Sequence, residues 1–195
     1  MQLTLVTGGA GSGKSEYAER LLTRCPCHGR RIYLATMRRE ENPETLSRIA
    51  RHRRQREGLG LVTLEQERDI PALIRDGRIR CEDAVLLEDL TNLLANETFV
   101  PDPRPVQEVL EELRQLADAC GRLVVVCNDL FADGELYDAE TMRFLRNLSF
   151  VQESLAALPG TELVRVVCGI PVTPGSRTDT ADGGTAPEEV EPFAH

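Results

Sequence analysis

The sequence lacks three features that would point away from a globular cytoplasmic protein. It has no long apolar run, so no segment is expected to span a membrane. Its first residues lack a basic start, a long apolar stretch and a small-residue cleavage site, so we predict no secretion signal. Basic residues number only 23 against 32 acidic ones, and the formal net charge of −9 argues against a general nucleic-acid binder. We therefore expect a cytoplasmic protein that does not bind nucleic acid.

Disulfide bonds are also not expected. The six cysteines lie in a chain without a predicted secretion signal, where reduced thiols are the rule. The segment Cys25-Pro26-Cys27-His28 could suggest a metal site. No second pair of ligands follows it at zinc spacing, so we favour a turn after a helix.

Short apolar segments alternate with amphipathic ones along a chain of 195 residues, which is the length of one domain. We expect strands at residues 2–7, 31–36, 61–64, 84–87, 123–127 and 163–167. We expect helices at residues 15–24, 44–56, 70–75, 91–96, 106–119 and 139–158. Asp69 is a candidate N-cap for the helix at 70–75, with Pro71 at an early helical position.

This alternation predicts a three-layer α/β/α domain with a mainly parallel sheet covered on both faces. The domain should occupy residues 1–171. From about Pro171 the composition turns to Pro, Gly, Thr, Asp and Glu, which cannot bury much apolar surface. We therefore expect residues 172–195 to form a disordered acidic tail.

A glycine-rich loop joins the first predicted strand to the first predicted helix. Its residues are Gly8, Gly9, Ala10, Gly11, Ser12, Gly13, Lys14 and Ser15, the Gly-x-x-x-x-Gly-Lys-Ser pattern of a phosphate-binding loop. Glycines allow a tight turn whose N–H groups point inward at an anion, and the helix N-terminus adds positive dipole. Lys14 would contact the β- and γ-phosphates, and the Ser15 hydroxyl would ligate Mg²⁺. The loop predicts binding of a nucleoside triphosphate with Mg²⁺.

Such a site also needs a carboxylate at the end of a neighbouring strand to hold the Mg²⁺ shell. Glu88 is the first polar residue after the strand at 84–87 and is our first candidate. Asp89 is the alternative, and Asn128-Asp129 after the strand at 123–127 is a weaker one. The carboxyl ends of strands are where open α/β sheets bind ligands.

Five arginines surround one histidine, His52, between residues 48 and 56 of this otherwise acidic chain. Spacing alone favours a solvated helix face with an ordinary surface histidine. In the other interpretation the arginines, Arg53 and Arg54 among them, neutralise phosphate oxygens. His52, kept neutral by these nearby cations, would then attack an α-phosphate as a nucleophile.

Several segments together resemble the family of bifunctional adenosylcobinamide kinases / adenosylcobinamide-phosphate guanylyltransferases of cobalamin biosynthesis. The most specific are the Ala35-Thr36 strand end, Arg48-Ile49 with His52, and Leu90-Thr91 with Asn96. The other matching segments are Val6–Ser15, Tyr33-Leu34, Thr63–Glu65, Leu86–Asp89, Asn128-Asp129 and Cys168–Pro171. Order and approximate spacing agree over residues 2–171.

The resemblance implies two reactions on a corrinoid acceptor. ATP or GTP first phosphorylates the aminopropanol hydroxyl of adenosylcobinamide, and GTP then donates GMP to that phosphate through a guanylylated histidine, here His52. Lys14 and His52 would be the catalytic residues, with Mg²⁺ held by Ser15 and Glu88. The implied nucleotide contacts are the residues of the loop 8–15, Ala35, Thr36, Met37, Arg53, Arg54, Gln55, Glu65 and Glu88. The family fold is a recombinase-like P-loop domain assembled as a homotrimer.

The chain departs from the family pattern between residues 129 and 153. The usual glycine-rich loop is replaced by Asp129–Asp138, and a later Gly and Asn-Gln pair is absent from the segment 145–153. A kinase or nucleotidyltransferase of the same fold acting on a different acceptor is therefore the alternative. A nucleotide-binding regulatory module without turnover is a third hypothesis, which the presence of Lys14 and Glu88 disfavours.

Overall fold

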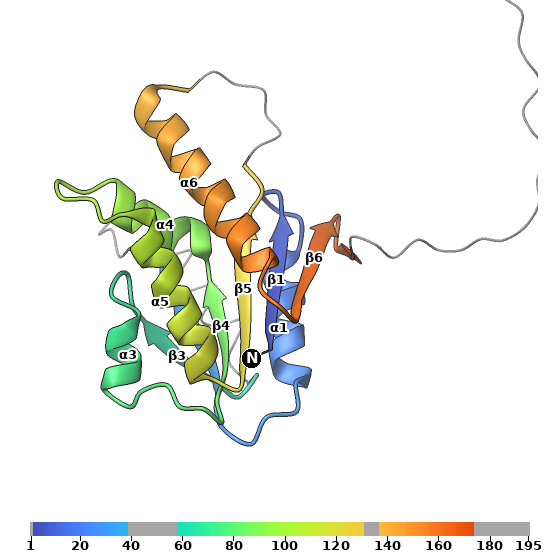
Figure 1. The fold of residues 1–195 in the computed structure, drawn as a ribbon. Coiled ribbons are helices and arrows are strands. Elements are labelled where there is room, and N and C mark those ends of the chain that lie inside the picture. Colours follow the sequence, from blue (N-terminus) through green and yellow to red (C-terminus); the bar gives the residue numbers. More distant parts are fainter. Residues whose placement is uncertain (1, 39–57, 131–136, 174–195) are drawn as a thin grey trace, which may run out of the picture.

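The computed structural model describes residues 2–38, 58–130 and 137–173, and these build one seven-stranded sheet. The strand order is β3-β2-β4-β5-β1-β6-β7, parallel throughout except for β7, which pairs antiparallel with β6 (Figure 1). The strands are β1 Leu3–Gly8, β2 Arg31–Ala35, β3 Leu61–Glu65, β4 Ala84–Glu88, β5 Arg122–Asn128, β6 Thr161–Val167 and β7 Ile170–Val172. The helices are α1 Lys14–Arg24, α3 Pro71–Arg75, α4 Leu90–Thr98, α5 Val106–Ala119 and α6 Ala139–Ala156.

Helices cover both faces of the sheet, because successive side chains of a strand point to opposite faces. Leu3 and Leu5 of β1 belong to the apolar cluster beneath α3, α4, α5 and α6. Val6 of the same strand packs instead with Ala18 and Leu22 of α1. Figure 1 shows α4, α5 and α6 in front of the sheet and α1 behind it. The predicted three-layer domain with a mainly parallel sheet is confirmed.

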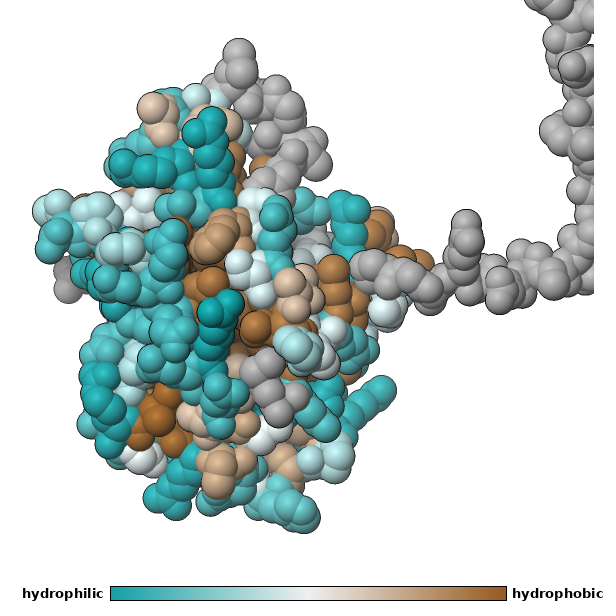
Figure 2. Space-filling model, viewed as in Figure 1, coloured by the Kyte–Doolittle hydropathy of each residue, from teal (hydrophilic) through white to brown (hydrophobic). Residues whose placement is uncertain are grey.

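Part of the α6 side of the sheet stays open between α6 and β6. Figure 2 shows apolar side chains gathered there. A cavity of about 310 Å³ lies at this place, and its lining combines Leu5, Ala156 and Leu163 with polar residues that include Thr7. Among the described residues, no helix is long and apolar enough to cross a membrane.

Two local predictions differ from the structure. Asp69 was a candidate N-cap, but Ile70 occupies the cap position of α3, and the Asp69 carboxylate accepts two hydrogen bonds from Arg75. The expectation was therefore wrong, because the Asp69 carboxylate binds the Arg75 side chain instead of capping the helix. Asp69 itself has a left-handed φ of 51°. The strand β7 was not predicted, and it extends to Val172, one residue past the expected domain end.

Other predictions lie at the edges of the described structure. The basic helix expected at 44–56 and almost all of the expected tail at 172–195 fall outside the described residues. All six cysteines are free thiols, as predicted. Cys25 is the C-cap of α1, so the Cys-Pro-Cys-His segment forms the connection from α1 to β2.

Candidate nucleotide-binding site

The glycine-rich loop lies between β1 and α1, at the carboxyl edge of the sheet. Its turn depends on Gly11 and Gly13, whose φ angles of 69° and 87° are left-handed values that residues with a side chain rarely adopt. Gly13 is the N-cap of α1, and the Ser12 amide donates to the Gly9 carbonyl at 3.2 Å. The loop therefore places the positive end of α1 beneath a tight backbone turn, which is the geometry of an anion nest.

The segments that follow the two neighbouring strands, β5 and β6, hold this loop in place. The Gly169 amide, in the β6–β7 turn, donates to the Ser12 carbonyl at 2.8 Å, and the Asp129 amide donates to the Gly8 carbonyl at 3.0 Å. A Cβ on Gly13 would lie 3.3 Å from the Gly169 Cα, and one on Gly8 would lie 2.7 Å from the Val166 carbonyl oxygen. Sequence reasoning missed Gly169 as part of the site, although the segment 168–171 was among those resembling the family.

Lys14 is the first residue of α1 and is 7% exposed. Its ammonium donates to the Gly9 carbonyl at 3.2 Å, so the side chain folds back across the loop that it follows. Its positive charge lowers the pKa of both Glu88 and Asp89, against the stronger effect of their burial. The ammonium group of Lys14 therefore lies beside the space that a phosphate bound in the loop would occupy.

Ser15 and Glu88 form the pair that could hold a metal ion. The Ser15 hydroxyl donates to Glu88 Oε1 at 2.6 Å, across the gap between α1 and the end of β4. Glu88 Oε2 is buried and has no hydrogen-bond partner among the described residues. A hydroxyl and a carboxylate with one unsatisfied buried oxygen are hard ligands of the kind that Mg²⁺ takes beside a phosphate loop. These two side chains therefore fit the expected ion.

Burial dominates the protonation of Glu88. Desolvation raises its pKa from 4.5 to about 7, helped by the charges of Asp89 and Glu19 and opposed by the Ser15 hydrogen bond and Lys14. A carboxyl group with such a pKa changes its charge near neutral pH, and a cation bound next to it would favour the charged form. Binding of a metal at this site is therefore expected to release a proton below about pH 7.

The alternative carboxylates have other partners. Asp89 is the N-cap of α4, where it accepts from the Asn92 amide at 2.7 Å and from Asn128 Nδ2 at 3.3 Å. Asp129 accepts from Arg165 at 2.7 Å. Both are thus occupied by structural contacts, which favours Glu88 as the metal-side carboxylate.

The predicted nucleotide contacts on β2 and β3 lie at the same edge of the sheet. Ala35, at the end of β2, is in register with Glu65 of β3 on one side and Glu88 of β4 on the other. The buried Thr36 follows and donates its amide to the Glu88 carbonyl at 3.0 Å, and the half-buried Met37 comes next. The other four predicted contacts, His52, Arg53, Arg54 and Gln55, lie outside the described residues.

A cavity of about 830 Å³ opens beside the loop. Its walls are residues 11–15, the α1 residues Glu16, Glu19, Arg20 and Thr23, and Leu59. Leu59 precedes β3 and is 40% exposed. The cavity therefore lies between α1 and the chain that enters β3.

The fold and this loop define a P-loop nucleotide-binding protein. A family model described as "Cobinamide kinase / cobinamide phosphate guanyltransferase" matches residues 4–173. The chain therefore belongs to the family of cobinamide kinases / cobinamide phosphate guanyltransferases, as the sequence resemblance implied.

A curated relative has a matching length. The "Bifunctional adenosylcobalamin biosynthesis protein CobU" of Salmonella typhimurium (strain LT2) is 28% identical over 183 residues, covering 87% of this chain and 98% of that protein.

Solved structures resemble the chain only weakly. The flagellar accessory protein FlaH from Methanocaldococcus jannaschii has a TM-score of 0.39 at 15% identity, covering 84% of this chain and 70% of that one. A type III secretion ATPase of pathogenic bacteria has a TM-score of 0.48 at 13% identity, covering 88% of this chain and 56% of that one. These likenesses carry no argument about function.

Proposed function

We propose that the chain phosphorylates adenosylcobinamide with ATP or GTP and then transfers GMP from GTP to the resulting phosphate, through a guanylylated His52. Family membership over residues 4–173 supports the two activities. The observation that carries the site assignment is the Ser15–Glu88 contact of 2.6 Å at the foot of the glycine-rich loop. It joins the phosphate loop to a carboxylate in the arrangement that phosphoryl transfer requires.

In the first reaction, the acceptor hydroxyl oxygen attacks the γ-phosphorus, and the bond from that phosphorus to the β–γ bridging oxygen breaks. The hydroxyl proton leaves to a base or to solvent, and a nucleoside diphosphate departs. The loop amides and Lys14 lie where the charge that develops on the leaving oxygen needs stabilisation. Ser15 and Glu88 would hold Mg²⁺, which supplies further charge neutralisation on the phosphate oxygens.

In the second reaction, a neutral His52 nitrogen attacks the α-phosphorus of GTP, and pyrophosphate leaves. A phosphate oxygen of the acceptor then attacks the same phosphorus, and the P–N bond breaks to regenerate His52. Leu59, seven residues after His52, lines the cavity beside the loop. Seven residues span at most about 25 Å, so the sequence position of His52 is compatible with reaching a bound α-phosphate.

Labelling with α-³²P GTP tests the histidine mechanism. Wild-type protein with Mg²⁺ should form an acid-labile, base-stable protein adduct, and His52→Ala should form none. His28→Ala is the matched control, because His28 lies in the α1–β2 connection and should leave labelling unchanged. Labelling of His52→Ala at the wild-type level would refute the assignment.

The competing proposal is a kinase or nucleotidyltransferase of the same fold that acts on an acceptor other than a corrinoid. The divergent segment 129–153 is the observation behind it. Titration of the protein with adenosylcobinamide, followed by the corrinoid absorbance spectrum, separates the two. A saturable spectral change, together with phosphate transfer from γ-labelled ATP or GTP, supports the corrinoid acceptor. Transfer to no corrinoid would favour the other acceptor.

We also propose that the chain forms a homotrimer in the cytoplasm. The family resemblance supports the trimer, and the edge strand β7 offers exposed apolar side chains, Ile170 and Val172, for a subunit contact. Six free thiols suit a reducing compartment. Sedimentation equilibrium should give three times the mass of 21.7 kDa, and a monomer would refute the assembly.

A further inference from the structure

Asn96 lies in the last turn of α4, and the proposed chemistry gives it no role. Its side-chain amide donates to the Thr36 carbonyl at 2.8 Å and to the Glu67 carbonyl at 3.1 Å. Both partners are carbonyl oxygens, so only the NH₂ end of the side chain can satisfy them, and both of its hydrogens are used. One side chain therefore ties together the segments that follow β2 and β3.

Thr36 is anchored from two other directions. Its amide donates to the Glu88 carbonyl at 3.0 Å, and its hydroxyl donates to the Asp89 carbonyl at 2.7 Å. The amide and hydroxyl thus attach Thr36 to the last residue of β4 and to the residue that follows it. The Thr36 carbonyl accepts from Asn96 instead, and this contact holds the backbone where it continues into Met37.

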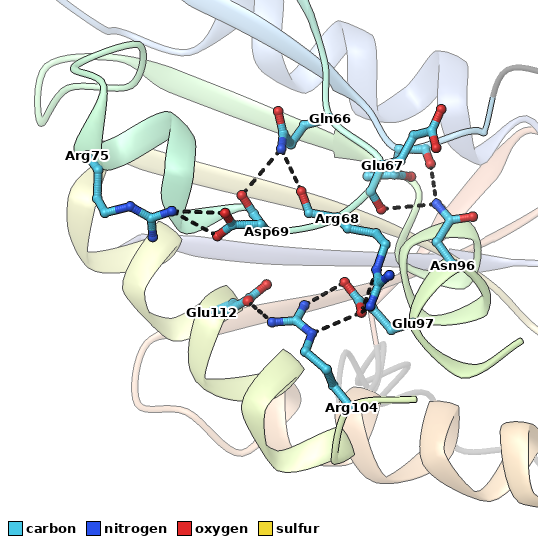
Figure 3. A network of polar contacts seen from close by, with 10 residues as sticks. Gln66, Glu67, Arg68, Asp69, Arg75, Asn96, Glu97, Arg104 and Glu112 are labelled. Carbon is cyan, nitrogen blue, oxygen red and sulfur yellow. Dashed lines mark hydrogen bonds and ion pairs between the residues drawn. The ribbon is translucent and has the colours of Figure 1, made fainter. Parts of the chain in front are cut away.

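The residues that directly follow Asn96 and Glu67, namely Glu97 and Arg68, are also in contact. Glu97, 1% exposed, accepts from Arg68 Nε at 2.9 Å and from Arg104 Nε at 2.9 Å, and Arg104 also pairs with Glu112 of α5. Figure 3 shows Asn96 facing Glu67, with Glu97 between Arg68 and Arg104. Because Arg68 follows Glu67 directly, two adjacent residues of α4 hold two adjacent residues of the loop after β3.

We infer that Asn96 is a positioning residue for nucleoside recognition, which sets the segments after β2 and β3 at a fixed separation across the carboxyl edge of the sheet. The inference rests on the proposed function and on the nucleotide contacts that the family resemblance implies at Ala35, Thr36, Met37 and Glu65. Those contacts are distributed over two strands, so their spacing must be held before GTP arrives if binding is to be tight. In the described structure Asn96 is linked to the phosphate loop indirectly, through Thr36, Glu88 and Ser15, so its loss should affect the loop less than the segments after β2 and β3.

This separation of roles gives a test with two ligands. GTP probes the phosphate loop and the β2–β3 segments, whereas inorganic triphosphate probes the loop alone. We expect Asn96→Leu, which keeps the size but removes both donors, to raise the Kd of GTP about tenfold by calorimetry with Mg²⁺. The Kd of triphosphate should change less than twofold. Asn96→Ser keeps one donor and should give an intermediate loss.

The matched control is Glu112→Gln, which breaks the far end of the ion-pair cluster without touching Thr36 or Glu67. It should lower the melting temperature and leave the ratio of the two Kd values unchanged. If Asn96→Leu lowers the melting temperature but keeps the wild-type ratio, Asn96 is only a structural tie and the inference is wrong. A parallel loss for both ligands would also overturn it.

The same experiment separates this inference from the proposed function. GTP binding can be measured without a corrinoid and, with every variant made in a His52→Ala background, without guanylylation of the protein. A protein that binds GTP in an Asn96-dependent manner but never transfers phosphate to adenosylcobinamide would refute the proposed function and support the inference. Wild-type protein that binds triphosphate and GTP equally well would refute the inference, whatever the reaction.

Discussion

Replacing Glu88 by glutamine should change how stability depends on pH, because this carboxyl group is buried at the metal-side position. Its pKa is raised from 4.5 to about 7, first by desolvation. Between these pH values the folded state retains a proton that the unfolded state has released. Glu88 therefore contributes stability that is fully present below pH 4.5 and is lost as pH rises through 7.

The magnitude follows from linkage. Each unit of pKa difference is worth about 1.4 kcal/mol, so the loss between pH 5 and pH 8 amounts to about 2–3 kcal/mol. For a chain of this length that corresponds to roughly 4–12 °C in melting temperature. Burial of this carboxyl group thus destabilises the ligand-free fold once the group ionises near neutral pH.

Urea unfolding of wild-type protein and Glu88→Gln at pH 5 and pH 8, without nucleotide or divalent metal, measures this effect. The amide introduced by glutamine costs the same at both pH values, so it cancels when the two mutational changes are subtracted. Relative to wild type, Glu88→Gln should gain about 2–3 kcal/mol on going from pH 5 to pH 8. Glu108→Gln makes the same chemical change at an exposed position of α5 and reports the background. A difference of zero, or of the opposite sign, would refute the reasoning.

Two further predictions concern the loop and the ion-pair cluster. Gly13→Ala should raise the Kd of inorganic triphosphate at least tenfold by calorimetry, because φ 87° strains alanine and its Cβ would lie 3.3 Å from Gly169. Gly77→Ala, with φ 66° far from the loop, should strain the backbone without changing that Kd, and an equal loss in both variants would contradict the assignment. Glu97→Gln should lower the free energy of unfolding by about 2 kcal/mol in urea, because Arg68 and Arg104 lose their buried carboxylate, while both arginines stay partly exposed and Arg104 keeps Glu112. A change below about 1 kcal/mol would show that the cluster is solvated.

The sequence predicted those parts of the fold that depend on neighbouring residues. Short apolar runs located six strands, and the spacing of Gly8, Gly13 and Lys14 located the phosphate loop. The order of residues after the predicted strand at 84–87 favoured Glu88 over Asp89. The structure supplies the physical reason, because the Asp89 carboxylate is occupied in capping α4.

Features that join distant residues could not be predicted in this way. The contact of Gly169 with Ser12 links positions far apart in the chain. In the sequence it is marked only by a glycine before a short strand. Asp69 looks like an N-cap from its position, but the arginine that binds its carboxylate lies six residues later. Asn96 was visible as part of a motif, yet its two carbonyl partners appear only when β2 and β3 lie side by side.

On the proposed function, a single loop must support attack at two different phosphorus atoms. In the kinase reaction the leaving charge develops on the β–γ bridging oxygen, and in the GMP transfer it develops on the α–β bridging oxygen. Both oxygens belong to the β-phosphate, which is the group that the loop amides and Lys14 would surround. The same preorganised cradle can therefore stabilise both departures. The outcome then depends on which nucleophile arrives, the acceptor hydroxyl at the γ-phosphorus or His52 at the α-phosphorus, and so the choice lies outside the loop.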